Sequence, residues 1–210
     1  MNLLVTAGNT LAPIDKVRGL TNIFTGRTGA AIAAEAKSRG HSVTLLTSHP
    51  QPGDVPFRTF DELHHLMADH VPRADAVVHC AAVSDYLVAG TYTAALGCGN
   101  PVDNSGKIKS DMPELWLRLV RAPKLVDQIR EPWGFRGVLV KFKLEVGISD
   151  EQLLTIAERS RVQSRADLMV ANTLEGASRV AFLGPLTSGY ERIARPDLPR
   201  CLLEEIERRI

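Results

Sequence analysis

Residues suited to holding an anion lie within the first 40 positions of the chain. A short apolar run ends at Gly8, and an alanine-rich stretch from Gly26 to Gly40 predicts a helix. The first N–H groups of a helix lack partners within the helix and carry the positive end of its dipole, so they bind phosphate. Asn22 and Thr25 stand just before this helix. We therefore predict that Asn22 and Thr25-Gly26 hold a phosphate or a phosphoanhydride intermediate.

The spacing of these glycines disfavours the dinucleotide-binding fingerprint of dehydrogenases. Gly8 and Gly26 are separated by 17 residues, whereas the pattern GxGxxG separates its first two glycines by one. A tight strand-to-helix turn without a ligand remains the alternative for this loop. Neither a Walker GxxxxGK(S/T) loop nor a GxSxG nucleophile elbow occurs, which removes the commonest ATPase and hydrolase sites.

A second group of candidate residues follows an almost continuous apolar strand, Ala76 to Ala82. Small side chains such as Ala81 let a base or a backbone approach closely. Asp85, just past the strand, could accept a hydrogen bond from a ribose hydroxyl, a base amine or a magnesium-bound water. A helix N-cap or a turn is the alternative role for Asp85.

Two further sets of residues could serve a nucleotide. Lys107 and Lys109 lie two positions apart in a polar excursion, so their ammonium groups would point the same way and could neutralise developing phosphate charge. Simple solvation is the alternative for this pair. Phe142 ends a predicted strand and could stack on a base or pack in the core, and Glu145 could bind a ligand amine or a metal-bound water.

Composition indicates an ordinary globular protein. The 210 residues are 44% hydrophobic and 23% charged, and 25 basic against 24 acidic side chains give a net charge of +1. No overall field would gather nucleic acid or an anionic membrane, and no run reaches the roughly 18 apolar residues of a membrane helix. Three widely spaced cysteines, Cys80, Cys98 and Cys201, favour a cytoplasmic location, and the histidines lack the HExxH pattern, so we expect no metal site.

Alternating strands and helices must position these residues. Strands are predicted at 3–6, 43–47, 76–82, 116–120, 137–142, 168–171 and 180–183, and helices at 26–40, 60–70, 124–130, 149–165 and 198–210. Ser149 and Gln152 form a capping box. The pattern predicts one α/β domain, 1–210, with a Rossmann-like, doubly wound, mainly parallel sheet that binds ligands at its carboxyl edge. We expect residues 87–121 to be an excursion with a flexible loop, used at the active site or in dimerisation.

The order and spacing of several motifs resemble phosphopantothenate–cysteine ligase. The matching segments are Val5 to Arg18, Leu20 to Asn22, Thr25 to Gly29, Ala81 to Tyr86, Lys107 to Lys109, Phe142 to Glu145 and Ala166 to Asn172. The resemblance implies a homodimeric, Rossmann-like ligase of coenzyme A biosynthesis that uses CTP, or ATP in eukaryotic members, with Mg²⁺. The carboxylate of 4′-phosphopantothenate would attack the nucleotide to give an acyl-nucleotide, and cysteine would then displace the nucleotide. No flavin is expected, because the flavin-dependent decarboxylase half of many bacterial members is absent from this stand-alone domain.

The resemblance also implies roles for individual residues. Asn22 would hold carbonyl or phosphate oxygens of the acyl-nucleotide, and Arg18 would order that loop or bind the anionic end of the substrate. Lys107 would serve the triphosphate and the closing loop. The remaining nucleotide contacts would be Gly8, Thr25, Gly26, Ala81, Asp85 and Phe142.

The chain departs from the family pattern mainly in its C-terminal part. Lys141 stands where the family has a glycine, and the family's phosphate-binding lysines are not clearly present after Asn172. Their substitutes could be Arg179, Arg192 or Arg195. One alternative is a non-catalytic paralogue that binds a nucleotide or a partner subunit. Another is a short-chain-type oxidoreductase, suggested by the fold and Tyr86, although neither GxGxxG nor Tyr-x-x-x-Lys occurs.

Overall fold

Continuous apolar runs of the chain form the central strands of one sheet. The computed structural model describes residues 1–93 and 100–210. Side chains of β1 (Asn2–Ala7), β6 (Ala76–His79) and β10 (Leu168–Thr173) are buried along almost their whole length, as expected of strands covered on both faces. The other members of the sheet are β4 (Ser42–Thr47), β5 (Val55–Pro56), β9 (Val138–Glu145), β11 (Val180–Leu186) and β12 (Gly189–Ala194).

The order of the strands places a ligand-binding crevice in the middle of the sheet. The order is β12-β11-β10-β9-β6-β1-β4-β5, and the six strands from β10 to β5 run parallel. From β1 the chain proceeds to β4 and β5 on one side, and from β6 it proceeds to β9 and β10 on the other. This reversal between β1 and β6 is the switch point at which open α/β sheets bind ligands. The predicted Rossmann-like, mainly parallel fold is therefore confirmed.

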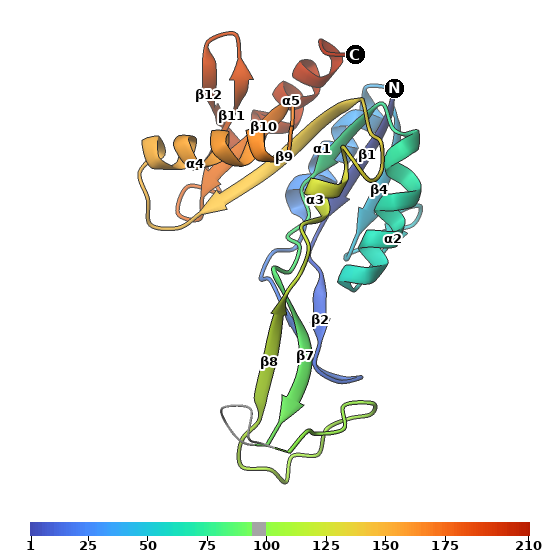
Figure 1. Ribbon diagram of the computed structural model, residues 1–210. Helices are drawn as coiled ribbons and strands as arrows, with labels where there is room; N and C mark the ends of the chain where they lie inside the picture. Colours follow the sequence, from blue (N-terminus) through green and yellow to red (C-terminus); the bar gives the residue numbers. More distant parts are fainter. Residues whose placement is uncertain (94–99) are drawn as a thin grey trace.

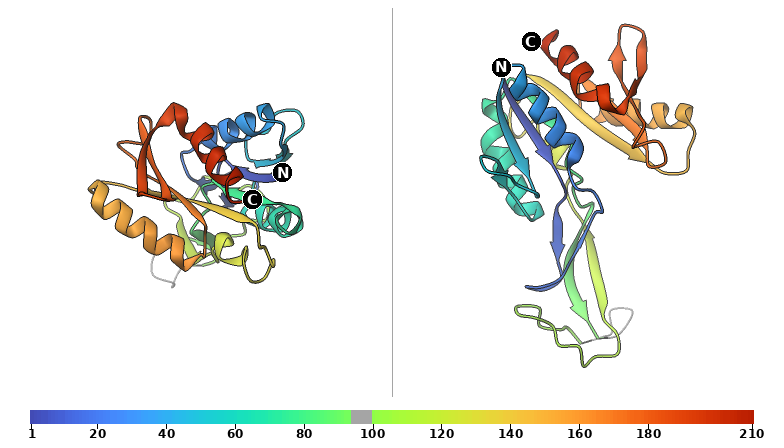
Figure 2. Two further views of the ribbon diagram at one scale, coloured as in Figure 1. Left: turned by 90° about the horizontal axis from the view of Figure 1, so that it is seen from above. Right: turned by 180° about the vertical axis from the view of Figure 1, so that it is seen from behind.

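Helices cover both faces of the sheet (Figures 1 and 2). On one face, α1 (Arg27–Ser38) and α5 (Leu198–Glu207) pack against alternate side chains of β1, such as Leu3. On the other face, α2 (Phe60–His70) and α3 (Leu125–Gln128) pack around Leu4, and α4 (Asp150–Gln163) packs on Met169 of β10. The short turns η1 (Val71–Arg73) and η2 (Arg195–Asp197) lead into β6 and α5. The five predicted helices are thus present: α2 has the predicted bounds, and α1, α3, α4 and α5 end slightly earlier than expected.

Side-chain caps fix the starts of two helices. The Ser149 hydroxyl accepts from the backbone N–H of Gln152 at 3.2 Å, and the Gln152 side chain accepts from the backbone N–H of Ser149 at 3.0 Å. This is the predicted capping box, and Thr59 with Glu62 forms a second one at α2. None of the helices in the described residues is long and apolar enough to span a bilayer.

An extended arm leaves the body at the carboxyl edge of the sheet (Figure 1). It consists of β7 (Tyr86–Tyr92) and β8 (Trp116–Arg121), which pair antiparallel. The sequence pattern predicts β8 but no strand at the position of β7. Ala89-Gly90 interrupts the β-forming residues of β7, and pairing with β8 satisfies its backbone groups. The predicted loop includes residues 94–99, with Cys98, which lie outside the described residues.

Short elements account for the other differences from the sequence prediction. β2 (Leu11–Pro13) and β3 (Gly19–Thr21) form a small hairpin in what was expected to be an irregular loop, and β2 lies beside the arm (Figure 2). β5 and β12 were also missed. β5 has only two residues, and the mixed polar sequence of β12 shows no alternation, so neither has a detectable hydrophobic period.

Candidate functional site

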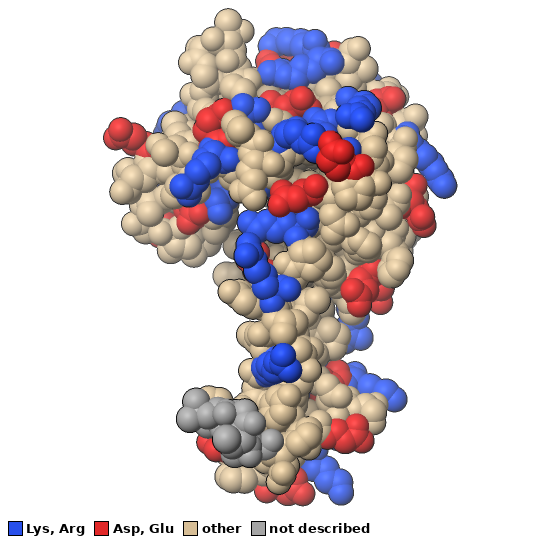
Figure 3. Space-filling view, viewed as in Figure 1, with Lys and Arg blue, Asp and Glu red and all other residues tan. Residues whose placement is uncertain are grey.

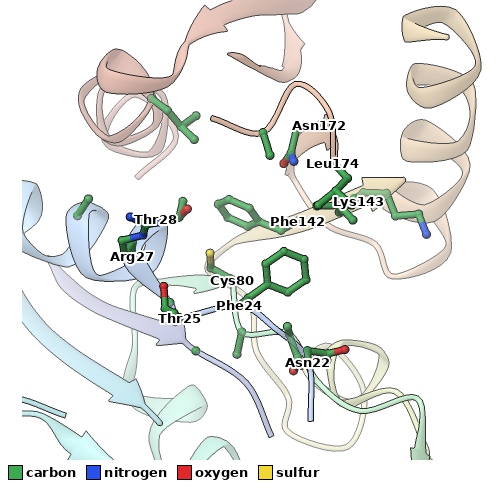
Figure 4. A pocket seen from close by; sticks show the side chains of 18 of the residues that line it. Asn22, Phe24, Thr25, Arg27, Thr28, Cys80, Phe142, Lys143, Asn172 and Leu174 are labelled. Carbon is green, nitrogen blue, oxygen red and sulfur yellow. Dashed lines mark hydrogen bonds between the residues drawn. The ribbon is translucent and has the colours of Figure 1, made fainter. Parts of the chain in front are cut away.

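A cavity of about 840 Å³ opens at the carboxyl ends of β1, β6 and β9, beside the switch point of the sheet. Figure 4 shows its lining side chains, which come from both halves of the chain. Arg18 and Lys107 are not among them. The cavity brings together the other predicted site residues, which are Gly8, Asn22, Thr25, Gly26, Ala81, Asp85 and Phe142.

Glycines bring the end of β1 into contact with the start of α1. Gly26 has φ = 75°, and a Cβ atom there would lie 2.4 Å from the backbone nitrogen of Gly8. Gly29, in the first turn, would place a Cβ atom 2.6 Å from that of Ala7. Gly26 is the N-cap residue and offers no side-chain cap. The Gly29 N–H is directed at the Cys80 thiol, which leaves the N–H groups of Arg27 and Thr28 for a ligand in the cavity.

Hydrogen bonds fix Asn22 at the edge of this cavity. Its side-chain N–H₂ donates to the backbone carbonyl of Ala82 at 3.1 Å. The backbone carbonyl of Asn22 accepts from the side-chain amide of Asn9. Asn9 is held in turn by Ser48, whose hydroxyl donates to Asn9 Oδ1 at 3.0 Å. Because the amide N–H₂ of Asn22 is held by Ala82, its orientation is set before a ligand arrives.

Ala81 and Asp85 form the wall that follows β6. The N–H of Ala81 donates to the Thr6 hydroxyl at 3.1 Å, and the carbonyl of Asp85 accepts from Ala122 at 2.9 Å. Asp85 is exposed at the rim of the cavity, directly before β7. An N-cap role for Asp85 is excluded, since the element that follows it is a strand.

Two aromatic rings occupy the middle of the cavity. Phe142 of β9 is partly buried, and Phe24, in the loop before α1, is 37% exposed; both rings point into the hollow (Figure 4). Stacking on a base is open to Phe142, which also contacts the core. Phe24 was missed in the sequence, although an exposed aromatic in a loop of Thr, Asn and Gly is a detectable signal.

Arg18 and Lys107 are grouped with each other, away from the cavity. The Arg18 guanidinium pairs with Asp15 at 2.6 Å and donates to the carbonyl of Ile108 at 2.8 Å. Ile108 donates back to Asp15 at 3.0 Å. Hydrogen bonding to Arg18 holds the pKa of Asp15 well below its usual range. The resemblance implies two roles for Arg18, and these contacts fit the ordering of its loop. They also hold Ile108, the neighbour of the exposed Lys107.

A smaller cavity of about 180 Å³ lies under the same wall and shares Asp85 and Phe142 with the main one. It reaches His79 and Lys141. The Lys141 ammonium donates to the Ser160 carbonyl at 3.1 Å and to the Ser164 hydroxyl. Burial lowers the pKa of Lys141 to about 8 and that of His79 to about 4. Through its hydrogen bonds to Ser160 and Ser164, Lys141 joins β9 to the end of α4.

Of the three arginines considered after Asn172, only Arg195 reaches the main cavity. Its guanidinium donates to the Thr28 hydroxyl, and its backbone N–H donates to the carbonyl of Arg179 at 2.8 Å. Arg179 and Arg192 are exposed and do not line the cavity. Arg27, Thr28 and Asn172 also line it and were not among the predicted site residues.

Two alternative kinds of site find no support in the described ranges 1–93 and 100–210. No group of three or more His, Cys, Asp or Glu side chains within them could hold a metal ion. Tyr86, which suggested an oxidoreductase, is 55% exposed at the start of β7 and does not line the main cavity.

The family of the chain follows from a comparison with known proteins. Residues 1–184 match the model of the DNA/pantothenate metabolism flavoprotein C-terminal domain. The chain belongs to this family. The family match confirms the resemblance to phosphopantothenate–cysteine ligase that the motifs indicated.

Relatives of this family share both sequence and fold with the chain. The coenzyme A biosynthesis bifunctional protein CoaBC of Thermococcus kodakarensis is 35% identical over an alignment of 220 positions that covers 98% of this chain and 51% of that protein. The chain thus spans about half the length of this relative. A DNA/pantothenate metabolism flavoprotein from Streptococcus pneumoniae is 27% identical, with a TM-score of 0.85 over 99% of this chain and 98% of that one. A Cab2 mutant in complex with phosphopantothenate-cysteine shares the fold, with 17% identity and a TM-score of 0.76 over 99% and 85% of the two chains.

Proposed function

We propose that the protein joins 4′-phosphopantothenate to cysteine through an acyl-nucleotide made from CTP. One observation supports this most strongly: a single cavity contains the uncapped start of α1, the fixed amide of Asn22 and the ring of Phe142. These groups suit a phosphate, an acyl-phosphate and a base. Family membership and the coenzyme A role named for the Thermococcus relative agree with the proposal.

The proposed reaction has two balanced steps. The carboxylate of phosphopantothenate attacks the α-phosphorus of CTP, an O–P bond forms, and pyrophosphate leaves. The amine of cysteine then attacks the acyl carbon, an amide bond forms, CMP leaves, and the amine loses a proton. Neither step needs a protein nucleophile, so positioned donors are sufficient for catalysis. Asn22 and the N–H groups that follow Gly26 are such donors.

Mg²⁺ would enter this cavity with the triphosphate. Mg²⁺ is usually held by one or two carboxylates together with substrate phosphates, and it requires no dedicated cage of protein ligands. The exposed carboxylate of Asp85 at the rim fits that requirement. Mg²⁺ would supply neutralisation of phosphate charge.

A second copy of the chain would complete the site. Arg18 and Lys107 lie outside the cavity of their own chain, on the arm side of the molecule. The arm and the adjoining hairpin expose large apolar side chains, which are Val17, Leu20, Trp116, Leu119 and Val120. Apolar surface of this kind favours a protein interface. In the proposed homodimer, the arm would bring Lys107 to a triphosphate.

A single-turnover assay tests the function. The protein is mixed with phosphopantothenate, Mg²⁺ and α-³²P-labelled CTP, first without and then with cysteine. In the first stage, labelled acyl-nucleotide and unlabelled pyrophosphate should appear. In the second stage, labelled CMP and the amide product should appear. ATP in a parallel reaction identifies the preferred base. Absence of pyrophosphate and acyl-nucleotide with both nucleotides would contradict the proposal, and nucleotide binding without turnover would favour a non-catalytic paralogue.

A further inference from the structure

The guanidinium of Arg195 is enclosed in the main cavity with part of its hydrogen-bonding capacity unused. The Nη1 atom is fully buried and has no partner in the described part of the chain. The Nη2 atom donates to the Thr28 hydroxyl, in the first turn of α1. Burial lowers the pKa of Arg195. Its neighbour Cys80 supplies no counter-charge, because burial raises the pKa of that thiol to about 12 and keeps it protonated. An enclosed cation without a counterion is unfavourable, and a bound anion would relieve that penalty.

The surroundings of Arg195 suit an anion. α1 has no acidic residue in its first turn, Gly26 offers it no side-chain cap, and Arg27 adds a second guanidinium to the lining. Lys143 also lines the cavity, but it pairs with Glu145 at 2.8 Å, and its side chain is directed away from the hollow in Figure 4. Positive charge therefore gathers at the α1 end of the cavity.

The position of Arg195 separates it from Asn22. Thr28, which holds the guanidinium, lies across the cavity from Asn22 (Figure 4). If the reacting phosphate lies at Asn22 and Gly26, the phosphates beyond it extend toward Thr28 and Arg195. Arg195 also lies beyond residues 1–184 that match the family, so the family match assigns it no role.

We propose that Arg195 binds the terminal phosphates of the nucleotide and stabilises the pyrophosphate that leaves. The proposal deepens the proposed ligase function and rests on it for the identity of the nucleotide. A planar guanidinium can donate two parallel hydrogen bonds to phosphate oxygens, and here Nη1 is free to donate while Thr28 fixes the orientation. In the first step, the bond between the α-phosphorus and the bridging oxygen breaks, and the charge that develops on pyrophosphate lies beside Arg195.

Three ligands separate this role from a general effect on the cavity. Isothermal titration measures the binding of inorganic pyrophosphate, CTP and CMP to the wild type, Arg195→Met, Arg195→Lys and Arg192→Met. Arg192→Met is the matched control, because Arg192 lies in β12, shortly before Arg195, and is exposed. Arg195→Met should weaken pyrophosphate and CTP roughly 10- to 100-fold, as expected for a lost charge-assisted hydrogen bond, with CMP changed less than about twofold. The affinities of Arg195→Lys for pyrophosphate and CTP should lie between those of the wild type and Arg195→Met. Arg192→Met should bind all three ligands as the wild type does.

Two results would overturn the proposal. One is unchanged pyrophosphate binding in Arg195→Met, and the other is an equal loss of CMP and CTP binding. Arg195→Lys keeps the charge and serves as the folded comparison if Arg195→Met has a lower Tm. Failure of the ligase function is distinguishable, because pyrophosphate binding needs no turnover. A wild type that binds pyrophosphate through Arg195 but forms no amide would contradict the function and leave the phosphate site in place.

Discussion

The carboxylate of Asp15 accepts a hydrogen bond from the backbone N–H of Ile108 at 3.0 Å, although 93 positions separate the two residues. The same carboxylate pairs with Arg18, whose guanidinium reaches the Ile108 carbonyl. Both backbone groups of Ile108 are thereby held by the β2–β3 turn. This anchoring fixes the base of the loop that carries Lys107, and it makes the position of Lys107 depend on Asp15.

Replacing Asp15 should release that loop. In Asp15→Asn, loss of the charge weakens the bonds to Ile108 and Arg18, so amide exchange at Ile108 should accelerate roughly tenfold or more. Hydrogen exchange followed by NMR or mass spectrometry measures this. Asp103→Asn is the matched control, because exposed Asp103 lies in the same loop and accepts from its close neighbour Ser105. Equal protection of Ile108 in the wild type and Asp15→Asn would show that the anchor does not order the loop.

Asn22→Asp should impair the first chemical step. The substitution places a negative charge where the acyl-phosphate would lie and removes the donor to Ala82, so the rate of acyl-nucleotide formation should fall about 100-fold. Quenched-flow measurement with labelled CTP gives this rate. Gln163→Glu adds a negative charge at an exposed position at the end of α4, outside the cavity, and should leave the rate unchanged. An unimpaired Asn22→Asp variant would refute the role of Asn22.

Gly26→Ala should destabilise the protein far more than Gly40→Ala does. Both glycines have positive φ, at 75° and 83°, but a Cβ atom at Gly40 meets open space, whereas one at Gly26 would lie 2.4 Å from Gly8. Gly40→Ala should cost about 1 kcal/mol and Gly26→Ala about 3 kcal/mol or more. Urea unfolding measures both free energies. Similar losses in the two variants would mean that the close approach of β1 to α1 is not required.

Stability should fall with acidification because of His79. Burial, followed by the charge of Lys141, lowers the pKa of His79 to about 4, whereas the unfolded chain has a value near 6.5. Between these values the unfolded state takes up a proton that the folded state excludes, so stability is lost as pH falls from about 6.5 to 4, by on the order of 3 kcal/mol. Above pH 6.5 the group contributes no pH dependence.

Unfolding of His79→Gln over this pH range provides the check. The variant has no titrating imidazole at this position and should lose less stability on acidification than the wild type. His65→Gln, at an exposed position of α2, is the comparison and should retain the wild-type pH dependence. An identical pH dependence in His79→Gln and the wild type would contradict the assignment.

The order of the elements could be predicted because the parallel strands are continuous apolar runs and the helices have caps or periodic apolar faces. The run before Cys80 is buried throughout, and Ser149 caps its helix as predicted. β7 was missed, because Ala89-Gly90 interrupts its β-forming residues and its partner β8 lies far along the chain. Strand pairs of this kind depend on tertiary contacts that no local pattern encodes.

The candidate site divides in the same way. Residues at strand ends and before α1, such as Gly8 and Asp85, were predictable because a parallel sheet gathers its carboxyl ends at one edge. The separation of Lys107 from the cavity was not predictable from the sequence, because it depends on the path of the arm. Arg195 could be named only as one of three arginines, because burial and the contact with Thr28 appear only when β12 is in place.

The two chain ends lie together at the edge of the sheet opposite the arm (Figures 1 and 2). β1 begins there and reaches the cavity at its carboxyl end, while α5 begins at the cavity and ends there. In Figure 3 the arm stands clear of the body on a narrow stem. A surface tether or a fluorescent reporter attached at either end would therefore leave both the nucleotide cavity and the arm accessible. Protein immobilised through one end could therefore be used to measure nucleotide binding at the cavity and, in a separate experiment, binding of a second copy at the arm.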